Sequence, residues 1–270
     1  MATPIGHRGD ITLRALVTLS SADVIACEDT RNSGALLAHY GIKKKQLISY
    51  HDHNADGRRP EILKHIAEGA SVALISDAGM PLIADPGYKL VRDCRDAGYD
   101  VVVIPGANAA ITALAGSGLP TDHFYFAGFL PPKSTARQKA IAALQAAPAT
   151  LVFYESPQRL ADTMQDLAKV LGGARLAAVA RELTKLYEET RRGTLQELAD
   201  FYEDADVKGE IVIIVAPPDA DAAPAHDLDA LLKQHMAELS LRDAVAAVCA
   251  LTNIKKSEVY ARALKLSGKE

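Results

Sequence analysis

Short apolar runs alternate along the chain with longer segments in which apolar positions recur every three or four residues. The short runs are typical of buried β-strands, and the periodic segments are typical of amphipathic α-helices. Strands are expected at residues 24–27, 46–50, 72–75, 101–104, 124–127, 150–154, 176–180 and 210–216. Helices are expected at residues 30–40, 60–68, 87–97, 135–146, 157–170 and 195–202. This alternation predicts a mostly parallel first sheet covered on both faces, followed by a second α/β unit.

Two interruptions of the pattern predict the domain organisation. A glycine and a proline near residue 118 separate two α/β domains, residues 1–117 and 118–217. Prolines, alanines and aspartates then predict a linker at 218–225. Beyond it only helical signals remain, which predicts a small C-terminal helical domain at 226–270, compatible with a helix-turn-helix. Its basic residues favour contact with RNA: Lys255, Lys256, Arg262, Lys265 and Lys269.

The stretch at residues 76–87 is longer and more rigid than a simple strand-to-helix connection requires, since it contains two glycines, two prolines and two aspartates. Open α/β sheets bind ligands at the carboxyl ends of their strands. We therefore expect residues 4–6, 77–87 and 105–109 to face one cleft between the two α/β domains. The chain has no GxxxxGK[ST] motif and no GxGxxG after a strand, which disfavours nucleoside triphosphates and dinucleotides as ligands.

Composition limits which binding partners and which cellular compartment are expected for this chain. A net charge of −4 and a pI near 6.1 exclude a uniformly basic surface, so any anionic partner must be met by local basic patches. Three cysteines without metal-ligand spacing predict buried thiols in a reducing cytoplasm. No apolar segment reaches membrane-spanning length, so no membrane contact is expected. His51 and His53 alternate in a geometry that can bind metal, but a hydrogen-bonded polar loop is favoured and no metal is expected.

Eight motifs occur in order along nearly the whole chain. They are ATPIG at 2–6, GDITLRAL at 9–16, EDTR at 28–31, SDAGMPLIADPG at 76–87, PGANA at 105–109, GFLP at 128–131, YESP at 154–157 and RELTK at 181–185. Together they resemble the ribosomal RNA small subunit methyltransferase I family of the tetrapyrrole methylase superfamily. That family usually has an apolar strand before the ATP tripeptide. Either the first sheet therefore lacks this strand, or the start of the chain is misassigned.

The resemblance implies a fold, an activity and partners. The fold is two α/β domains of the tetrapyrrole methylase type with a cofactor cleft between them, plus the C-terminal helical domain. The implied activity is S-adenosylmethionine-dependent methylation of a ribose 2′-hydroxyl in 16S rRNA of the small ribosomal subunit. The acceptor is a cytidine, 1402 in the usual rRNA numbering. A cytoplasmic homodimer is implied as well.

The family's cofactor-binding residues transfer to this sequence where the motifs match. A cofactor with an adenine, an amino acid and a sulfonium needs backbone hydrogen bonds, an apolar wall and a carboxylate. Asp85 could equally be a helix-start aspartate before Pro86. The implied contacts are Pro4, Asp77, Gly79, Pro81, Ile83, Ala84, Asp85, Ala109, Phe153 and Tyr154.

Methyl transfer requires that the hydroxyl be held in line with the methyl group and relieved of its proton. Charged residues at strand ends of the second domain supply three catalytic candidates, Glu155, Glu182 and Lys185. The lysine could act as a base only if burial or a cationic neighbour such as Arg181 lowered its pKa. The alternative is that residues 181–189 form a solvated charged segment.

Basic residues on loops and helices are the candidate RNA contacts, because arginine pairs well with phosphate. They are Arg31, Lys133, Arg137, Lys139, Arg181, Lys185, Arg191 and Arg192. The chain has no tryptophan and only 5% aromatic residues, which favours shape and phosphate recognition over base stacking. Two alternatives remain open at this stage: a tetrapyrrole (precorrin) methyltransferase on the same scaffold, and a catalytically idle RNA-binding protein.

Overall fold

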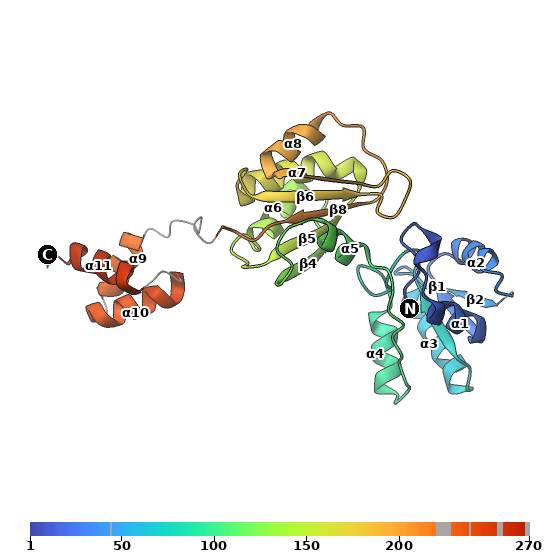
Figure 1. Cartoon of the computed structure of the whole chain (residues 1–270). Coiled ribbons are helices and arrows are strands. Elements are labelled where there is room, and N and C mark those ends of the chain that lie inside the picture. Colours follow the sequence, from blue (N-terminus) through green and yellow to red (C-terminus); the bar gives the residue numbers. More distant parts are fainter. Residues whose placement is uncertain (44, 220–227, 238, 253–255, 268–270) are drawn as a thin grey trace. The chain divides into compact units, whose positions relative to one another are not determined.

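The computed structural model describes residues 1–43, 45–219, 228–237, 239–252 and 256–267. The chain divides into two compact units, Met1–Pro217 and Pro218–Glu270. The first unit contains two β-sheets, and the second is helical (Figure 1). The two sheets that the sequence predicts are therefore present.

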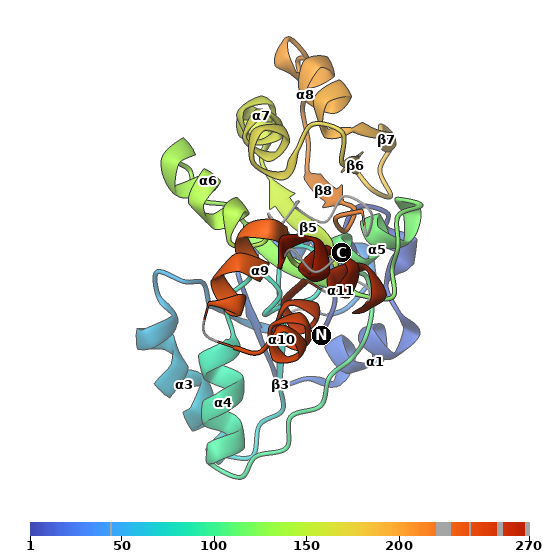
Figure 2. The same cartoon turned by 90° about the vertical axis from the view of Figure 1, so that its left-hand side faces the viewer.

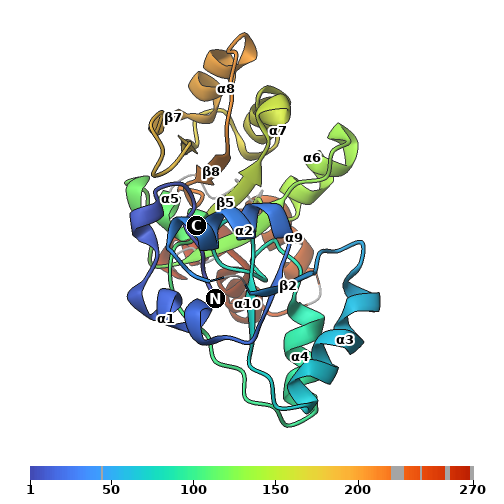
Figure 3. The same cartoon turned by 90° about the vertical axis from the view of Figure 1, so that its right-hand side faces the viewer.

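The first sheet has three parallel strands in the order β2-β1-β3: β1 (Val24–Cys27), β2 (Gln46–Ser49) and β3 (Val72–Ile75). Alternate side chains of a strand point to opposite faces, so each face has its own core. Ile25 and Cys27 pack with Leu19 and Leu37 from the first two helices, whereas Val24 packs with residues of the next two. The elements around this sheet are η1 (Arg8–Asp10), α1 (Leu13–Ser21), α2 (Thr30–His39), α3 (Ala55–Ala67) and α4 (Tyr88–Asp96). Helices α3 and α4 lie side by side (Figures 2 and 3).

The strand expected at residues 101–104 is wrong, because this segment forms no ladder with a neighbour. Val102 and Val103 are 66% and 64% exposed. The Met1 ammonium donates to the carbonyl of Leu74 on β3 at 2.8 Å, and the Ala2 amide donates to the Ile104 carbonyl at 3.3 Å. The first two residues thus connect β3 with Ile104 through single hydrogen bonds, without forming a ladder with either segment.

The second sheet has five strands in the order β4-β5-β8-β6-β7. Its strands are β4 (Phe124–Phe129), β5 (Thr150–Glu155), β6 (Leu176–Arg181), β7 (Glu189–Thr194) and β8 (Ile211–Val215). Only β4 and β5 pair in parallel, and the other pairs are antiparallel. Strand β7 was not predicted, because its sequence ETRRGT contains no apolar run and it pairs along one side only.

Helices cover both faces of this sheet. Helices α7 and α8 share a core with Phe153, while α5 packs on the opposite face against Val152 and Ile214 (Figure 2). The elements are α5 (Ala109–Gly116), α6 (Ser134–Ala142), η2 (Pro157–Arg159), α7 (Leu160–Leu171) and α8 (Leu195–Glu203). Alternate side chains of β5 therefore lie in two different cores, one on each face of the sheet.

The second unit consists of α9 (Leu228–Met236), α10 (Leu241–Thr252) and α11 (Lys256–Leu266). Leu232, Val245 and Val259 are fully buried in its core. Arg262 on α11 pairs with Asp229 on α9 at 2.6 Å. The expected linker lies outside the described residues from residue 220 on, as do Lys255 and Lys269. Each helix in the described parts of the chain is too short or too polar to span a membrane.

Candidate functional site

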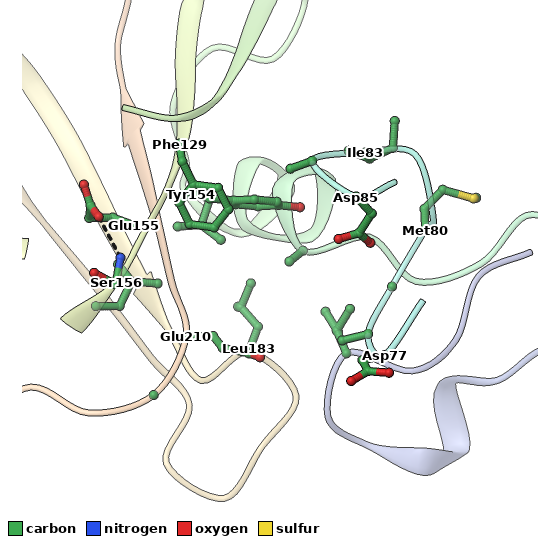
Figure 4. A pocket seen from close by; sticks show the side chains of 18 of the residues that line it. Asp77, Met80, Ile83, Asp85, Phe129, Tyr154, Glu155, Ser156, Leu183 and Glu210 are labelled. Carbon is green, nitrogen blue, oxygen red and sulfur yellow. Dashed lines mark hydrogen bonds between the residues drawn. The ribbon is translucent and has the colours of Figure 1, made fainter. Parts of the chain in front are cut away.

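A cavity of about 410 Å³ lies between loop 76–87 and the second sheet. Figure 4 shows Asp85 and Met80 on one wall and Tyr154 and Phe129 on the other. The wall is mostly apolar, and its acidic groups come from both sheets. It is lined by Ile5, Glu28, Asp77, Ala78, Gly79, Met80, Ile83, Ala84, Asp85, Ala109, Phe129, Tyr154, Glu155, Ser156, Pro157, Leu183, Gly209, Glu210, Ile211 and Val212.

Loop 76–87 is fixed by the N-terminal segment and has unusual backbone angles. Thr3 and Gly79 exchange backbone hydrogen bonds of 2.9 and 3.1 Å, and the Thr3 hydroxyl donates to the Ser76 carbonyl at 3.1 Å. Leu82 and Ala84 have φ values of 71° and 62°, in the left-handed region that non-glycine residues rarely adopt. Strained backbone of this kind persists only where its surroundings determine it, and it concentrates at ligand sites.

Asp77 is anchored to the start of α2. Its carboxylate accepts hydrogen bonds from the Asn32 side-chain amide at 2.6 Å and from the Asp29 backbone N–H at 3.2 Å. Asp29 itself caps α2 by accepting from the Arg31 backbone N–H at 2.8 Å. Loop 76–87 is thereby held in register with the loop that follows β1.

Asp85 lies on the cavity wall in a partly desolvated position. Burial raises the pKa of its carboxyl group to about 6; the Ser76 hydrogen bond opposes the shift, and the charges of Glu28, Asp52 and Asp77 add to it. Burial, followed by the Asp77 charge, also raises the pKa of Glu28. Glu28, Asp77 and Asp85 therefore share this wall, and the Asp77 charge adds to the rise in the pKa of the other two, which is an environment suited to a positively charged ligand.

Tyr154 forms the opposite, aromatic wall. Its ring packs edge to face against Phe126 and Phe129, with centroids 5.0 and 5.6 Å apart, and its hydroxyl accepts from the Ala110 backbone N–H at 3.3 Å. Phe153 is fully buried on the other face of β5, so the expectation that it lines the cleft is wrong.

Glu155 borders the cavity, but its carboxylate lies on the far side of the strand (Figure 4). There it accepts hydrogen bonds from the Thr163 hydroxyl at 2.7 Å and the Ser156 N–H at 2.8 Å, and it pairs with Arg159 at 3.3 Å. The side chain is completely buried. A buried carboxylate with this many partners that is turned away from the cavity is a structural group, so Glu155 is not placed to take a proton from a substrate.

Glu182 and Lys185 lie outside the cavity wall, although Leu183 between them contributes to it. The Lys185 ammonium contacts Glu182 at 2.8 Å and Glu210 at 2.9 Å. Burial alone would lower the pKa of Lys185, but the hydrogen bonds to the two glutamates outweigh it and raise that pKa. The condition for a lysine base is therefore not met. The Lys185 hydrogen bond likewise lowers the pKa of Glu182, so both groups stay charged.

The loop that carries Lys185 is pinned against the N-terminal loop. The His7 backbone N–H donates to the Thr184 hydroxyl at 2.9 Å. A Cβ added to Gly6 would lie 2.6 Å from Lys185 Cγ and 3.0 Å from the Leu183 carbonyl oxygen. Residues 181–189 are thus a partnered, docked segment rather than a freely solvated charge run.

Among the predicted RNA contacts, Arg137 is wrong. It is 2% exposed, and its guanidinium pairs with buried Asp166 at 2.6 Å. The Arg31 side chain is 88% exposed, and Lys133 is exposed as well. Arg181 pairs with Glu189 at 3.4 Å.

Arg191 likewise has intramolecular partners: it pairs with Glu189 at 2.8 Å and stacks over the Phe201 ring at 3.7 Å. Its side chain keeps 39% exposure. These contacts fix the direction of the guanidinium group without burying it.

The structure brings most of the predicted cofactor residues together. Those on the cavity wall are Asp77, Gly79, Ile83, Ala84, Asp85, Ala109 and Tyr154. Pro4 and Pro81 are buried outside the wall, like Phe153. Sequence reasoning missed Glu28, although its position directly after β1 is a strand-end signal. It also missed Phe129, Met80 and Glu210.

A second cavity adjoins the first and shares Glu28 and Asp77 with it. His51 and His53 also line it, with ring centroids 6.0 Å apart. Across the described part of the chain, no group of three or more histidine, cysteine, aspartate or glutamate side chains is arranged to hold a metal ion. The Asn54 amide lies 3.1 Å from His51 Nε2, as in a hydrogen-bonded polar loop.

Comparisons with known proteins agree with this geometry. Residues 2–199 match the family described as Tetrapyrrole (Corrin/Porphyrin) Methylases, and residues 222–267 match the RsmI C-terminal HTH domain. The chain is 51% identical to a Mesorhizobium japonicum protein named ribosomal RNA small subunit methyltransferase I, over 98% of this chain and 90% of the relative. It is 46% identical to the protein of that name from Escherichia coli O157:H7, over 98% and 94% of the two chains.

Solved structures show the same fold at low identity. The Thermus thermophilus uroporphyrin-III C-methyl transferase complexed with S-adenyl homocysteine has a TM-score of 0.55 at 20% identity, covering 79% of this chain and 94% of that one. A cobalt precorrin-4 methyltransferase has a TM-score of 0.59 at 17% identity, covering 80% and 92%.

Proposed function

The chain belongs to the ribosomal RNA small subunit methyltransferase I family, and we propose that it methylates the ribose 2′-hydroxyl of a cytidine in 16S rRNA, 1402 in the usual numbering. It is an S-adenosylmethionine-dependent methyltransferase. The observation that carries the proposal is the cavity between the two sheets, where the Asp85 carboxyl faces the aromatic wall of Tyr154. A cleft with one acidic and one aromatic wall suits a cationic cofactor that has a flat base.

The residues present fit S-adenosylmethionine, which supplies a methyl group on a positively charged sulfur. Asp85 and Asp77 offer carboxylates to its cationic parts, and the backbone of loop 76–87 offers amides and carbonyls. Tyr154 and Ile83 give apolar surface for the adenine. The hydrogen bonds from Thr3 and Asn32 hold this wall in place before any ligand arrives, which reduces the ordering cost of binding.

We propose Asp85 as the group that accepts the hydroxyl proton as the ribose oxygen takes the methyl group. A general base works best when its pKa lies near the working pH, and the carboxyl of Asp85, with its pKa of about 6, comes close to that condition. Most of the acceleration is assigned to positioning of the two reactants in the cleft. Glu182 and Lys185 contribute by fixing the loop that presents Leu183.

We further propose that the substrate is recognised on the assembled small ribosomal subunit by a cytoplasmic homodimer. A chain of net charge −4 has little general affinity for RNA, so contact must come from local groups. Arg31, Lys133 and Lys139 are exposed and suited to phosphate contact, and the C-terminal unit would add Lys256.

The test is transfer of a labelled methyl group from S-adenosylmethionine to 30S subunits that lack the modification. Naked 16S RNA and a precorrin serve as parallel acceptors, and nuclease digestion locates the label on the ribose. Label on a 30S ribose is the expected result. Label on the precorrin alone would establish a tetrapyrrole methyltransferase instead, and cofactor binding without any transfer would indicate an idle RNA-binding protein.

A further inference from the structure

The second cavity is the part of the cleft that cofactor binding does not explain. It has a volume of about 470 Å³ and is lined by Glu28, Asp29, Thr30, Arg31, Ser49, His51, His53 and Asp77. These residues come from the ends of β1 and β2, the start of α2 and the loop after β3. Since Glu28 and Asp77 belong to both cavities, a group held in the second cavity lies next to a ligand held in the first.

The three carboxylates of this cavity, Glu28, Asp29 and Asp77, differ in how many hydrogen bonds their oxygens already accept. Both oxygens of Asp77 accept hydrogen bonds, one from Asn32 and one from the Asp29 N–H. Asp29 is engaged by the Arg31 backbone and guanidinium, and the Arg31 hydrogen bond lowers the pKa of Asp29 to about 2. Glu28 receives a hydrogen bond from the Asp77 backbone, yet burial keeps its pKa raised. Glu28 is therefore the carboxylate with most to gain from a new donor.

Hydrogen-bonding side chains and the Arg31 guanidinium line the second cavity together with Glu28. The Ser49 hydroxyl donates to the Glu28 carbonyl at 3.4 Å, and Thr30 contributes a second hydroxyl to the wall. His51 Nδ1 is buried without a hydrogen-bond partner within the described chain. Arg31 is fixed by Asp29 while its side chain remains 88% exposed, so it can still meet an anion at the cavity mouth.

We propose that the second cavity receives the base of the methyl acceptor, with Glu28 accepting a hydrogen bond from the exocyclic amino group of cytosine and Arg31 pairing with an adjacent phosphate. This inference rests on the proposed function. A carboxylate that accepts from the cytosine amino group is a known mode of base readout. Uracil carries a carbonyl at that position. Its oxygen and the Glu28 carboxylate are both hydrogen-bond acceptors, so they would repel each other. Glu28 thus selects cytidine over uridine.

The experiment compares wild-type protein and Glu28→Gln on two sets of 30S subunits, reconstituted with 16S transcripts that carry cytidine or uridine at the target position. Wild-type protein is expected to prefer cytidine by about tenfold or more in kcat/KM. Glu28→Gln is expected to reduce this preference to within about threefold, because a glutamine amide can serve either base. Glu68→Gln, on the exposed end of α3, is the matched control and should keep the wild-type ratio.

Equilibrium binding of the same two 30S preparations, measured without cofactor, gives the ratio independently of turnover. Because this binding measurement contains no cofactor, it still reports the cytidine-to-uridine ratio if Glu28→Gln also binds S-adenosylmethionine more weakly. An unchanged cytidine-to-uridine ratio in Glu28→Gln, or equal use of both bases by wild-type protein, would overturn the inference. Failure of wild-type protein to methylate either 30S preparation while it binds S-adenosylmethionine would instead count against the proposed function.

Arg31→Ala separates the phosphate contact from base readout. It should weaken 30S binding for both bases by a similar factor, leave the cytidine preference in place and reduce the salt dependence of binding. Loss of the cytidine preference in Arg31→Ala with unchanged overall affinity would contradict the assigned division of roles.

Discussion

The side-chain amide of Asn32 donates a hydrogen bond of 2.6 Å to the carboxylate of Asp77. Because Asn32 lies in the first turn of α2 and Asp77 follows β3, this contact joins the loops at the carboxyl ends of two adjacent parallel strands. Asp77 borders both cavities. The position of the acidic wall is therefore set by a contact across the sheet edge, and not by loop 76–87 alone.

Asn32→Ala should weaken cofactor binding, because Asp77 loses a charge-assisted hydrogen bond that fixes its direction. Such a bond contributes about 1.5–3 kcal/mol where it is fully effective, and about 1 kcal/mol at this exposed position. We expect roughly a fivefold increase in the Kd for S-adenosylmethionine in isothermal titration calorimetry. Gln145→Ala, in an exposed turn after α6, is the control and should bind like wild-type protein. Equal affinity for the Asn32 variant would show that Asp77 does not depend on this contact.

Asp85→Asn should make the fold more stable at high pH while it removes activity. The pKa of Asp85 is about 6 in the folded chain against an ordinary value of 3.8, so the folded state binds more protons between these limits. Stability must therefore fall as pH rises through this window, and the full penalty is present above pH 6. Because Asp85 is only partly buried, we expect a gain of about 1 kcal/mol for Asp85→Asn at pH 8 and none below pH 3.8. Urea unfolding at both pH values measures the difference.

The same carboxyl group should govern the pH dependence of methyl transfer. The rate is expected to rise with pH through an inflection at or below about 6, the pKa of Asp85 in the chain without cofactor, because the positive charge of S-adenosylmethionine lowers this pKa and only the ionised carboxylate can accept a proton. Single-turnover rates on 30S subunits from pH 5 to 8 test this, with S-adenosylmethionine held at saturation. A profile with the same inflection in Asp85→Asn would assign the titration to another group and remove Asp85 from the proton-accepting role.

The sequence predicts most of the fold and about half of the site, and the failures have physical causes. Loop 76–87 was recognisable because its glycines and prolines have no place inside a helix or strand. The run that contains Phe153, Tyr154 and Glu155 was not resolved, because a strand buried on both faces gives no alternation to show which residues face the cleft. Arg137 was misassigned although it precedes buried Ile141 by four residues on the same helix face.

Arg137→Ala should lower the stability of the fold. It should remove no RNA contact, because the Arg137 side chain is buried. The variant leaves Asp166 buried without its guanidinium partner, which costs about 3–5 kcal/mol. Lys139→Ala, exposed on the same helix, should change the free energy of unfolding by less than about 0.5 kcal/mol. It should instead weaken 30S binding at low salt. Equal stability of the two variants in urea unfolding would contradict the burial of Arg137.

Gly6→Ala should impair methyl transfer by displacing the loop at residues 182–188 from the N-terminal loop. The new Cβ would lie 2.6 Å from Thr184 Oγ1 and 3.0 Å from the Leu183 carbonyl oxygen, so side-chain rotation alone cannot relieve the clash. Because Leu183 lines the cavity, its shift should lower kcat/KM by roughly tenfold or more.

Gly57→Ala is the matched control for Gly6→Ala, because nothing lies within 4 Å of a Cβ at this position in α3. The control should keep full activity and be at least as stable as wild-type protein, since alanine is favoured over glycine in a helix and Gly57 lies in the first turn of α3. Full activity of Gly6→Ala, with a folded structure confirmed by circular dichroism, would mean that the docked loop at 182–188 does not shape the site. Loss of activity in Gly6→Ala but not in Gly57→Ala would tie catalysis to the contact between the N-terminal loop and the loop at residues 182–188.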